Sequence, residues 1–133
     1  MEVREGMSDL VLTVGLGHTL REAARMMSER GVGAAVVLDE ESPGPRIISE
    51  RDVLRSVGAG QDPDSERVGD HVSDSVITAS PDWSLERAAS EMAARRIRHL
   101  VIVEGPEIVG MLSMRDIMRV WTQEGATSAM TPG

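Results

Sequence analysis

Two short motifs hold the residues best suited to chemistry in this chain. Ser-x-x-Asp occurs at Ser49–Asp52 and again at Ser113–Asp116, each time directly after two apolar residues. A serine at the start of a helix lies beside unpaired backbone N–H groups and the positive end of the helix dipole, which favours a phosphate. An aspartate three residues later lies one turn on, on the same face, where its carboxylate can accept two hydrogen bonds from a ribose diol.

The same spacing is also that of a capping box. In a capping box the two side chains only satisfy N–H groups that the start of a helix leaves without partners. One motif alone does not separate capping from ligand binding, and the two roles are compatible in the free protein. The repetition of the motif in a repeated context favours a ligand contact.

The segments that position these motifs are repeated along the chain. Apolar residues at i, i+3, i+4 and i+7 predict a helix from Leu20 and another from Leu85. Each is followed by a run of β-branched residues that predicts a buried strand, then by a turn, a second strand and the helix that begins at Ser49 or Ser113. One more short strand precedes each first helix. The predicted strands are residues 10–14, 34–38 and 46–48 in the first copy and 75–79, 100–103 and 108–112 in the second.

The fold class is therefore α/β, with two repeats of strand, helix, strand, strand and helix. We expect the first repeat at residues 7–60, a linker at 61–70, the second repeat at 71–122 and a C-terminal tail at 123–133. A single half with three short strands and two helices buries little apolar area, so the two halves are expected to pack against each other.

This arrangement resembles a tandem pair of CBS domains, the family named for cystathionine β-synthase, which is often called a Bateman module. The likeness covers roughly residues 7–122. It rests on "RIISERDVL" at 46–54, "RIRHLVIV" at 96–103, "VGMLSMRDIM" at 109–118 and the paired helix starts "HTLREAARMM" and "WSLERAASEM". The resemblance implies pseudo-twofold packing of the repeats and two clefts between their sheets. Such clefts often bind AMP, ADP, ATP or S-adenosylmethionine, and the modules usually regulate rather than catalyse.

Position by position, the resemblance assigns ligand contacts to the repeated motifs. Asp52 and Asp116 are predicted to bind ribose hydroxyls, and Ser49 and Ser113 are predicted to lie near a phosphate.

The other candidate residues flank these motifs, and each has a plainer alternative. Thr13, Thr78 and Ala79 match strand positions that offer backbone or small side chains to an adenine, where strand packing is the alternative. Arg51 and Arg115 could reach phosphates, although a surface helix arginine is the commoner explanation.

Arg98 and His99 are phosphate candidates of the second repeat alone, because "RIRH" aligns with "GVGA" of the first repeat. A solvated cationic cluster at the end of a helix is the alternative. The glycine expected before the apolar pair is present as Gly110 but replaced by Arg46 in the first copy. We therefore expect the cleft of Asp116 to bind more tightly than that of Asp52.

Composition excludes several classes of function. The net charge of −8 and the two aromatic residues, both tryptophan, argue against a nucleic-acid binder. No cysteine is present, which excludes disulfides and thiolate metal sites. No segment has the length of a signal peptide core or a membrane span, so we expect a soluble, cytoplasmic protein.

Enzymatic activity is not expected. The histidines His18, His71 and His99 have no metal-ligand spacing, and no nucleophile motif is present. "GLGHTL" at 15–20 follows a strand like a dinucleotide fingerprint, but Leu20 replaces the third glycine, so we interpret it as a turn. We predict no metal and no cofactor other than a regulatory adenosine ligand.

Two functions remain open. One is a module that senses an adenosine ligand and acts on an unknown partner protein; the other is a dimeric scaffold that has lost its ligand. For either function we expect a homodimer through methionine-rich helix faces such as those of Met26, Met27 and Met118. The alternative is that these methionines fill the core of the monomer.

Overall fold

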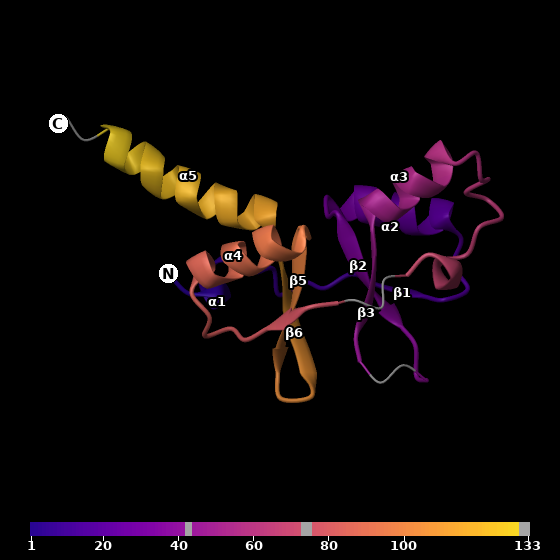
Figure 1. The fold of residues 1–133 in the computed structure, drawn as a ribbon, viewed down its shortest axis with the longest axis horizontal. Coiled ribbons are helices and arrows are strands. Elements are labelled where there is room, and N and C mark those ends of the chain that lie inside the picture. The colour runs from indigo at the N-terminus through magenta and orange to yellow at the C-terminus, as the bar shows by residue number, and fades with distance from the viewer. Residues whose placement is uncertain (42–43, 73–75, 131–133) are drawn as a thin grey trace. The chain divides into compact units, whose positions relative to one another are not determined.

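The chain forms two compact units in a computed structural model that describes residues 1–41, 44–72 and 76–130, with side chains to residue 123 (Figure 1). Unit 1 joins Met1–Leu10 to Ile77–Gly133, and unit 2 is Val11–Val76. Unit 2 contains β1 (Thr13–Gly15), α2 (Leu20–Arg30), β2 (Ala34–Leu38), β3 (Arg46–Ser49), α3 (Glu50–Gly58) and the 3-10 helix η1 (Val68–Asp70). Unit 1 contains α1 (Val3–Gly6), β4 (Thr78–Ala79), α4 (Leu85–Arg95), β5 (His99–Glu104), β6 (Glu107–Ser113) and α5 (Met114–Met130).

Each unit is built on one three-stranded sheet, in the order β1-β2-β3 or β4-β5-β6. The first two strands of each sheet are parallel and the last two are antiparallel. The predicted order of elements in both repeats is therefore confirmed. β1 is shorter than the predicted strand 10–14. Its hydrogen bonding to β2 begins only at Leu12, whose carbonyl accepts the amide of Val36 (2.9 Å). β4 keeps Thr78 and Ala79 of the predicted 75–79, of which residue 75 lies outside the described residues.

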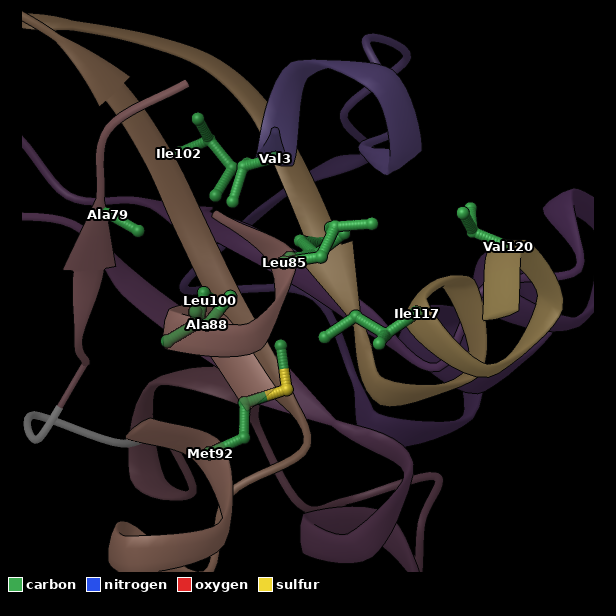
Figure 2. Packing of buried hydrophobic residues seen from close by; sticks show 10 residues of the cluster. Val3, Ala79, Leu85, Ala88, Met92, Leu100, Ile102, Ile117 and Val120 are labelled. Carbon is green, nitrogen blue, oxygen red and sulfur yellow. The ribbon is translucent and has the colours of Figure 1, made fainter. Parts of the chain in front are cut away.

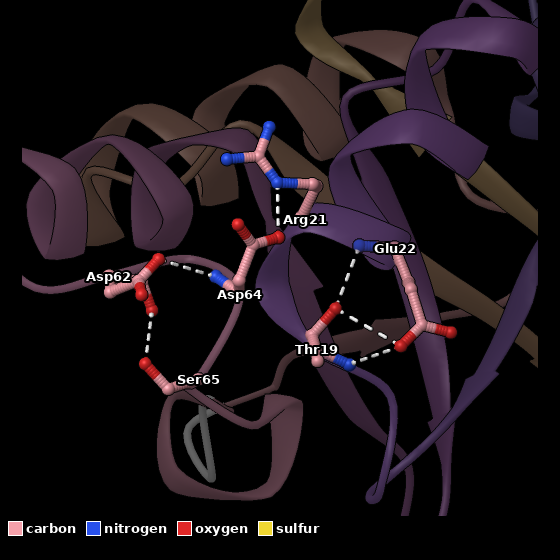
Figure 3. Close-up of polar contacts among 6 residues, drawn as sticks. All are labelled: Thr19, Arg21, Glu22, Asp62, Asp64 and Ser65. Atoms are coloured by element: carbon pink, nitrogen blue, oxygen red, sulfur yellow. Dashed lines mark hydrogen bonds and ion pairs between the residues drawn. The ribbon is translucent and has the colours of Figure 1, made fainter.

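The first helix of each repeat begins at a hydroxyl side chain. Thr19 and Glu22 form a capping box at α2: the Glu22 amide donates to Thr19 Oγ1 (3.1 Å), and Glu22 Oε1 accepts from the Thr19 amide (3.2 Å) (Figure 3). The hydrogen bond from the Thr19 amide, followed by that from its hydroxyl, holds the pKa of Glu22 below its ordinary value. At α4, Ser84 Oγ accepts the amide of Arg87 (3.0 Å).

The segment after α3 is tied to the start of α2. The carbonyls of Pro63 and Glu66 accept the amides of Arg21 (3.1 Å) and Leu20 (3.0 Å). Arg21 also pairs with Asp64 (Figure 3), and this contact raises the pKa of the arginine. Residues of the predicted linker 61–70 therefore belong to the fold of unit 2.

The helices of each unit pack on one face of its sheet. In unit 1 the buried cluster draws on α1, α4, α5 and all three strands (Figure 2), through Val3, Ala79, Leu85, Ala88, Met92, Leu100, Ile102, Leu112, Ile117 and Val120. In unit 2 it consists of Leu12, Val14, Leu20, Ala23, Met27, Ala35, Val37, Ile48 and Val68. Met27 was expected on a dimer interface, but it is only 3% exposed and fills the core of unit 2.

Each unit receives a short helix that precedes the other repeat in the sequence. α1 precedes the first repeat but packs in unit 1, where the Val3 amide donates to the Trp83 carbonyl (2.7 Å). η1 precedes the second repeat but packs in unit 2, where the Val68 amide donates to the His18 carbonyl (2.8 Å). Val3 and Val68 are both fully buried. The sequence did not predict this exchange of short helices.

α5 continues to Met130, through part of the segment 123–133 that was expected to be a tail. In unit 1 it packs against α4 and α1. Within the described ranges, no helix has the length and apolar character needed to cross a membrane.

Candidate functional site

Ser49 and Asp52 form a closed capping box at the start of α3. Asp52 Oδ2 accepts from the Ser49 amide (2.8 Å) and from Ser49 Oγ (2.9 Å), while the Asp52 amide donates to Ser49 Oγ (3.4 Å). Both side chains are half-buried. Asp52 Oδ1 has no hydrogen-bond partner among the described residues. One oxygen of this carboxylate is thus used by the fold and the other remains for a ligand.

Ser113 and Asp116 repeat this geometry at the start of α5. Asp116 Oδ2 accepts from the Ser113 amide (2.9 Å) and from Ser113 Oγ (2.8 Å), and the Asp116 amide donates to Ser113 Oγ (3.0 Å). In this copy Oδ1 also has a partner, because Arg119 Nη2 lies 3.2 Å away. The capping role that the spacing predicts is therefore present in both repeats.

The first turns of α3 and α5 leave one amide each for an anion. The first amide is already bonded, from Glu50 to the carbonyl of Gly33 (2.9 Å) and from Met114 to the carbonyl of Arg98 (2.8 Å). The third amide bonds the capping serine. The second amide, that of Arg51 or Arg115, has no acceptor in the part of the chain that the structure describes. An acceptor placed beside the serine hydroxyl could use this amide.

In unit 1 three of the candidate residues share one face of the sheet. His99 lies directly opposite Ser113 in the ladder, and Thr78 lies opposite Val101. Because alternate residues point to opposite faces and Leu100 belongs to the core, His99 and Ser113 point away from the helices. Thr78 points the same way.

Ala79 does not join this face. It is 3% exposed and lies in the core cluster, so only its backbone could contact a ligand on the other face. Strand packing, the alternative weighed for this position, accounts for its side chain.

Unit 2 has the same arrangement with fewer candidates. Ser49 lies opposite Ala34, and Thr13 lies opposite Val36. Val14 and Ile48 belong to the core, so Thr13 and Ser49 point away from the helices.

The candidate cations differ between the units. Arg51 is exposed in unit 2, whereas Arg98 and Arg115 are both exposed in unit 1, next to half-buried His99. Sequence reasoning missed a further residue, Arg96, which the structure places two residues before Arg98 in a left-handed backbone conformation. The sequence contained a signal for this residue: Arg96 aligns with Gly31, and a helix end that favours glycine in one repeat holds an arginine in the other.

Gly110 is required by packing within unit 1. A Cβ atom on Gly110 would lie 2.8 Å from the sulfur of Met7 and 2.8 Å from the carbonyl oxygen of Ser8. Ser8 pairs with Met111 beside β6 through two hydrogen bonds of 2.9 and 3.0 Å. The glycine therefore makes room for the N-terminal segment, and it does not support the tighter cleft that we inferred from it. Its counterpart Arg46 pairs instead with Asp39 (2.7 Å).

The remaining polar candidates have structural partners. His18 Nδ1 accepts the amide of Gly15 (2.9 Å), which fits the interpretation of "GLGHTL" as a turn. His71 Nε2 lies 2.8 Å from Glu66 Oε1. Among the described residues, no three His, Asp or Glu side chains are grouped so that they could hold a metal ion.

Comparison with known proteins matches both repeats. A family model described as "CBS domain" matches residues 2–59 and 68–122. The CBS domain-containing protein YhcV of Bacillus subtilis is 33% identical over 131 residues, which cover 97% of this chain and 92% of YhcV. The chain covers 57% and 54% of two longer relatives, from Methanopyrus kandleri and Arabidopsis thaliana.

Solved structures share the fold. The CBS domain protein PAE2072 from Pyrobaculum aerophilum, complexed with AMP, is 32% identical with a TM-score of 0.78 over 96% of this chain and 99% of that one. A hexameric CBS-CP12 protein from bloom-forming cyanobacteria is 26% identical with a TM-score of 0.82, over 89% of this chain and 69% of that one.

Proposed function

Because this chain belongs to the CBS domain family, we propose that it is a regulatory module that binds an adenosine phosphate and signals this to a partner protein. One observation carries the proposal: both repeats present the Ser-x-x-Asp pair at a helix start, with the serine on the sheet face away from the helices. The AMP complex of the relative from Pyrobaculum aerophilum supports this class of ligand. The cytoplasmic location stays a prediction from composition.

Each candidate side chain has a defined task in this proposal. The serine hydroxyl and the amide of the following arginine, Arg51 or Arg115, bind phosphate oxygens at the helix N-terminus. The aspartate keeps Oδ2 in the capping box and uses Oδ1 for a ribose hydroxyl, which Asp116 would accept alongside its contact with exposed Arg119. In unit 1 Arg98 and His99 add donors for the phosphate.

Capping and binding cooperate in this arrangement. The hydrogen bonds to Oδ2 fix the aspartate rotamer, so little side-chain freedom is lost when a ribose hydroxyl binds Oδ1. The scaffold alternative draws on the same observation, because the capping boxes alone explain why serine and aspartate occur at these positions.

Titration calorimetry with AMP, ATP and S-adenosylmethionine separates the two functions. We expect Asp116→Ala to weaken binding of an adenosine phosphate roughly tenfold or more, since a carboxylate hydrogen bond contributes about 1–3 kcal/mol. Asp52→Ala should have a smaller effect, because unit 2 lacks counterparts of Arg98 and His99.

The control for this experiment is Ser84→Ala. It removes the cap of α4, at a similar cost of about 1 kcal/mol to stability, at a position outside the candidate site. Its ligand affinity should equal that of the parent. Failure of the parent to bind any adenosine ligand would leave the scaffold function.

We also propose that the module is a homodimer. Apolar side chains are exposed at matching places on the second helix of each repeat, Leu54 (71%) and Val57 (50%) on α3 and Met118 (58%) and Trp121 (41%) on α5. Exposed apolar residues one turn apart are suited to pairing of helices between two copies.

A further inference from the structure

Arg96 has a backbone conformation that an arginine rarely adopts. It follows α4 with φ 56° and ψ 41°, and it is the one residue other than glycine with positive φ in the described ranges. Its counterpart after α2 is Gly31, with φ 64° and ψ 33°. This conformation crowds any side chain against the backbone, whereas glycine adopts it freely. Strained residues of this kind often lie at ligand sites.

The helix dipole does not explain an arginine at this position. A cation at the C-terminal end of a helix is favourable, but Arg95 already supplies one, and it also pairs with Glu91 (2.9 Å). In α2 the cation at the C-terminal end of the helix is Arg30, and the next residue is Gly31. The arginine at position 96 thus adds a second cation at the helix end, at the cost of a strained backbone conformation.

The arginines of unit 1 fall into two groups. Members of the first have partners within the unit: Arg4 with Glu2 and Asp82, Arg87 over the ring of Trp83 (3.7 Å), Arg95 with Glu91, and Arg119 with Asp116. Arg96, Arg98 and Arg115 are exposed and have no partner among the residues that the structure describes. These three, which we name the arginine corner, are uncompensated in a chain with a net charge of −8.

The arginine corner is brought together by the backbone. The carbonyl of Arg98 accepts the amide of Met114 (2.8 Å), so the start of β5 lies against the residue before Arg115. Arg96 is two residues before Arg98, at most about 7 Å along the chain. Arg115 lies in the first turn of α5, where the helix dipole disfavours a cation. A bound anion would compensate all three charges.

We propose that the arginine corner binds the phosphates of a polyphosphorylated ligand, with Arg96 determining specificity for the phosphates beyond the first. The inference rests on the proposed function for the adenosine part of the ligand. Ser113, the Arg115 amide and Arg98 take the first phosphate, and Arg96 reaches the following ones. A nucleoside triphosphate should then bind more tightly than a diphosphate, and both more tightly than a monophosphate, because each added phosphate adds charge near the guanidinium groups.

Unit 2 lacks this device. Gly31 corresponds to Arg96, because it follows α2 in the same left-handed conformation. Gly33 corresponds to Arg98, because its carbonyl accepts the first amide of α3, as the Arg98 carbonyl accepts that of α5. Only Arg51 remains, and acidic Glu50 precedes it. Selectivity for added phosphates should therefore come from unit 1 alone.

Calorimetry of the full chain with AMP, ADP, ATP and inorganic tripolyphosphate, without magnesium, tests the proposal. The parent should bind ATP about tenfold more tightly than AMP. Arg96→Gly should remove most of this difference and change the affinity for AMP less than about twofold. Because glycine suits the left-handed turn, the same variant without ligand should melt about 3 °C higher. If Arg96 had only a structural role, Arg96→Gly would not raise the melting temperature and at the same time lower the affinity for ATP.

Arg30→Gln is the matched control, because it removes one exposed charge at the corresponding helix end of unit 2. It should leave the ratio of ATP to AMP affinity unchanged. Equal losses of AMP and ATP affinity in Arg96→Gly, or no loss of either, would overturn the inference.

The ligand series keeps this inference distinct from the proposed function. If the parent binds AMP and gains no affinity with added phosphates, the inference fails and the function stands. If only tripolyphosphate binds, and Arg96→Gly weakens it, the function fails and the arginine corner stands. If no ligand of the series binds, both fail.

Discussion

At the scale of single residues, Gly110 gives the sharpest prediction of stability. Gly110→Ala places a methyl group 2.8 Å from Met7 Sδ and Ser8 O. Relief requires movement of backbone, so we expect a loss of about 1–3 kcal/mol in the free energy of unfolding, measured by urea denaturation.

A glycine in open space checks the cause of that loss. Gly17→Ala should change stability by less than about 0.5 kcal/mol, because nothing lies within 4 Å of a Cβ there. An equal loss in both variants would show that replacement of a glycine, and not contact with Met7 and Ser8, is responsible.

Residue types could be interpreted from the sequence where the reason for them is local. The hydroxyl and carboxylate of Ser113 and Asp116 meet within one helical turn, so their spacing predicted the contact that the structure contains. The reason for Gly110 is not local, because its neighbours Met7 and Ser8 are distant in the chain. A glycine preceding two apolar residues therefore looked like part of a ligand site.

At the scale of elements, the exchanged short helices predict that each repeat depends on a residue outside it. Val3→Ala removes two methyl groups from the core of unit 1 and should cost about 2 kcal/mol. Hydrogen exchange should become faster at the Leu100 and Leu112 amides of unit 1, while Ile48 of unit 2 stays protected. Val68→Ala should give the reverse pattern.

Leu10→Ala is the matched control for these variants, because Leu10 is 77% exposed. It should leave exchange unchanged in both units. Faster exchange in unit 2 on Val3→Ala would contradict the assignment of α1 to unit 1.

Elements with a repeated apolar pattern were predictable, and the short ones were not. α2 and α4 span eleven residues each, enough to show apolar spacing, and hydroxyl residues mark their starts. α1 spans four residues and η1 spans three. Helices this short have no detectable period, and they are held by tertiary contacts such as those of Val3 and Val68.

At the scale of the whole molecule, the exposed apolar residues of α3 and α5 predict the state of association. The parent should have the mass of a homodimer by light scattering at micromolar concentration. Leu54→Asp or Met118→Asp should shift it toward the monomer, because a carboxylate in an apolar interface loses its hydration.

Ile108→Asp serves as the control, since Ile108 is exposed (38%) in β6 rather than on either helix. It should leave the dimer intact. A monomeric mass for the parent would contradict the proposal of a dimer.

The family and the repeated order of elements could be recognised from the sequence, because duplication leaves the same pattern twice. Which residues make up each of the two units could not be recognised from the sequence. Repeats are continuous in sequence, whereas unit 1 joins Met1–Leu10, at the start of the chain, to the second repeat. Sequence periodicity carries no information about which sheet a preceding segment joins.

The exchange of short helices also sets an order of events during synthesis. Unit 2 is one continuous stretch, so it can fold as soon as residue 76 has left the ribosome. Residues 1–10 are made before unit 2, yet their partners in β6 and α4 are made after the whole of unit 2. Val3 and Met7 must therefore stay unburied while unit 2 forms. Unit 1 closes only when residues 1–10 meet α4 and β6, and this late, long-range contact is expected to be the slow step of folding.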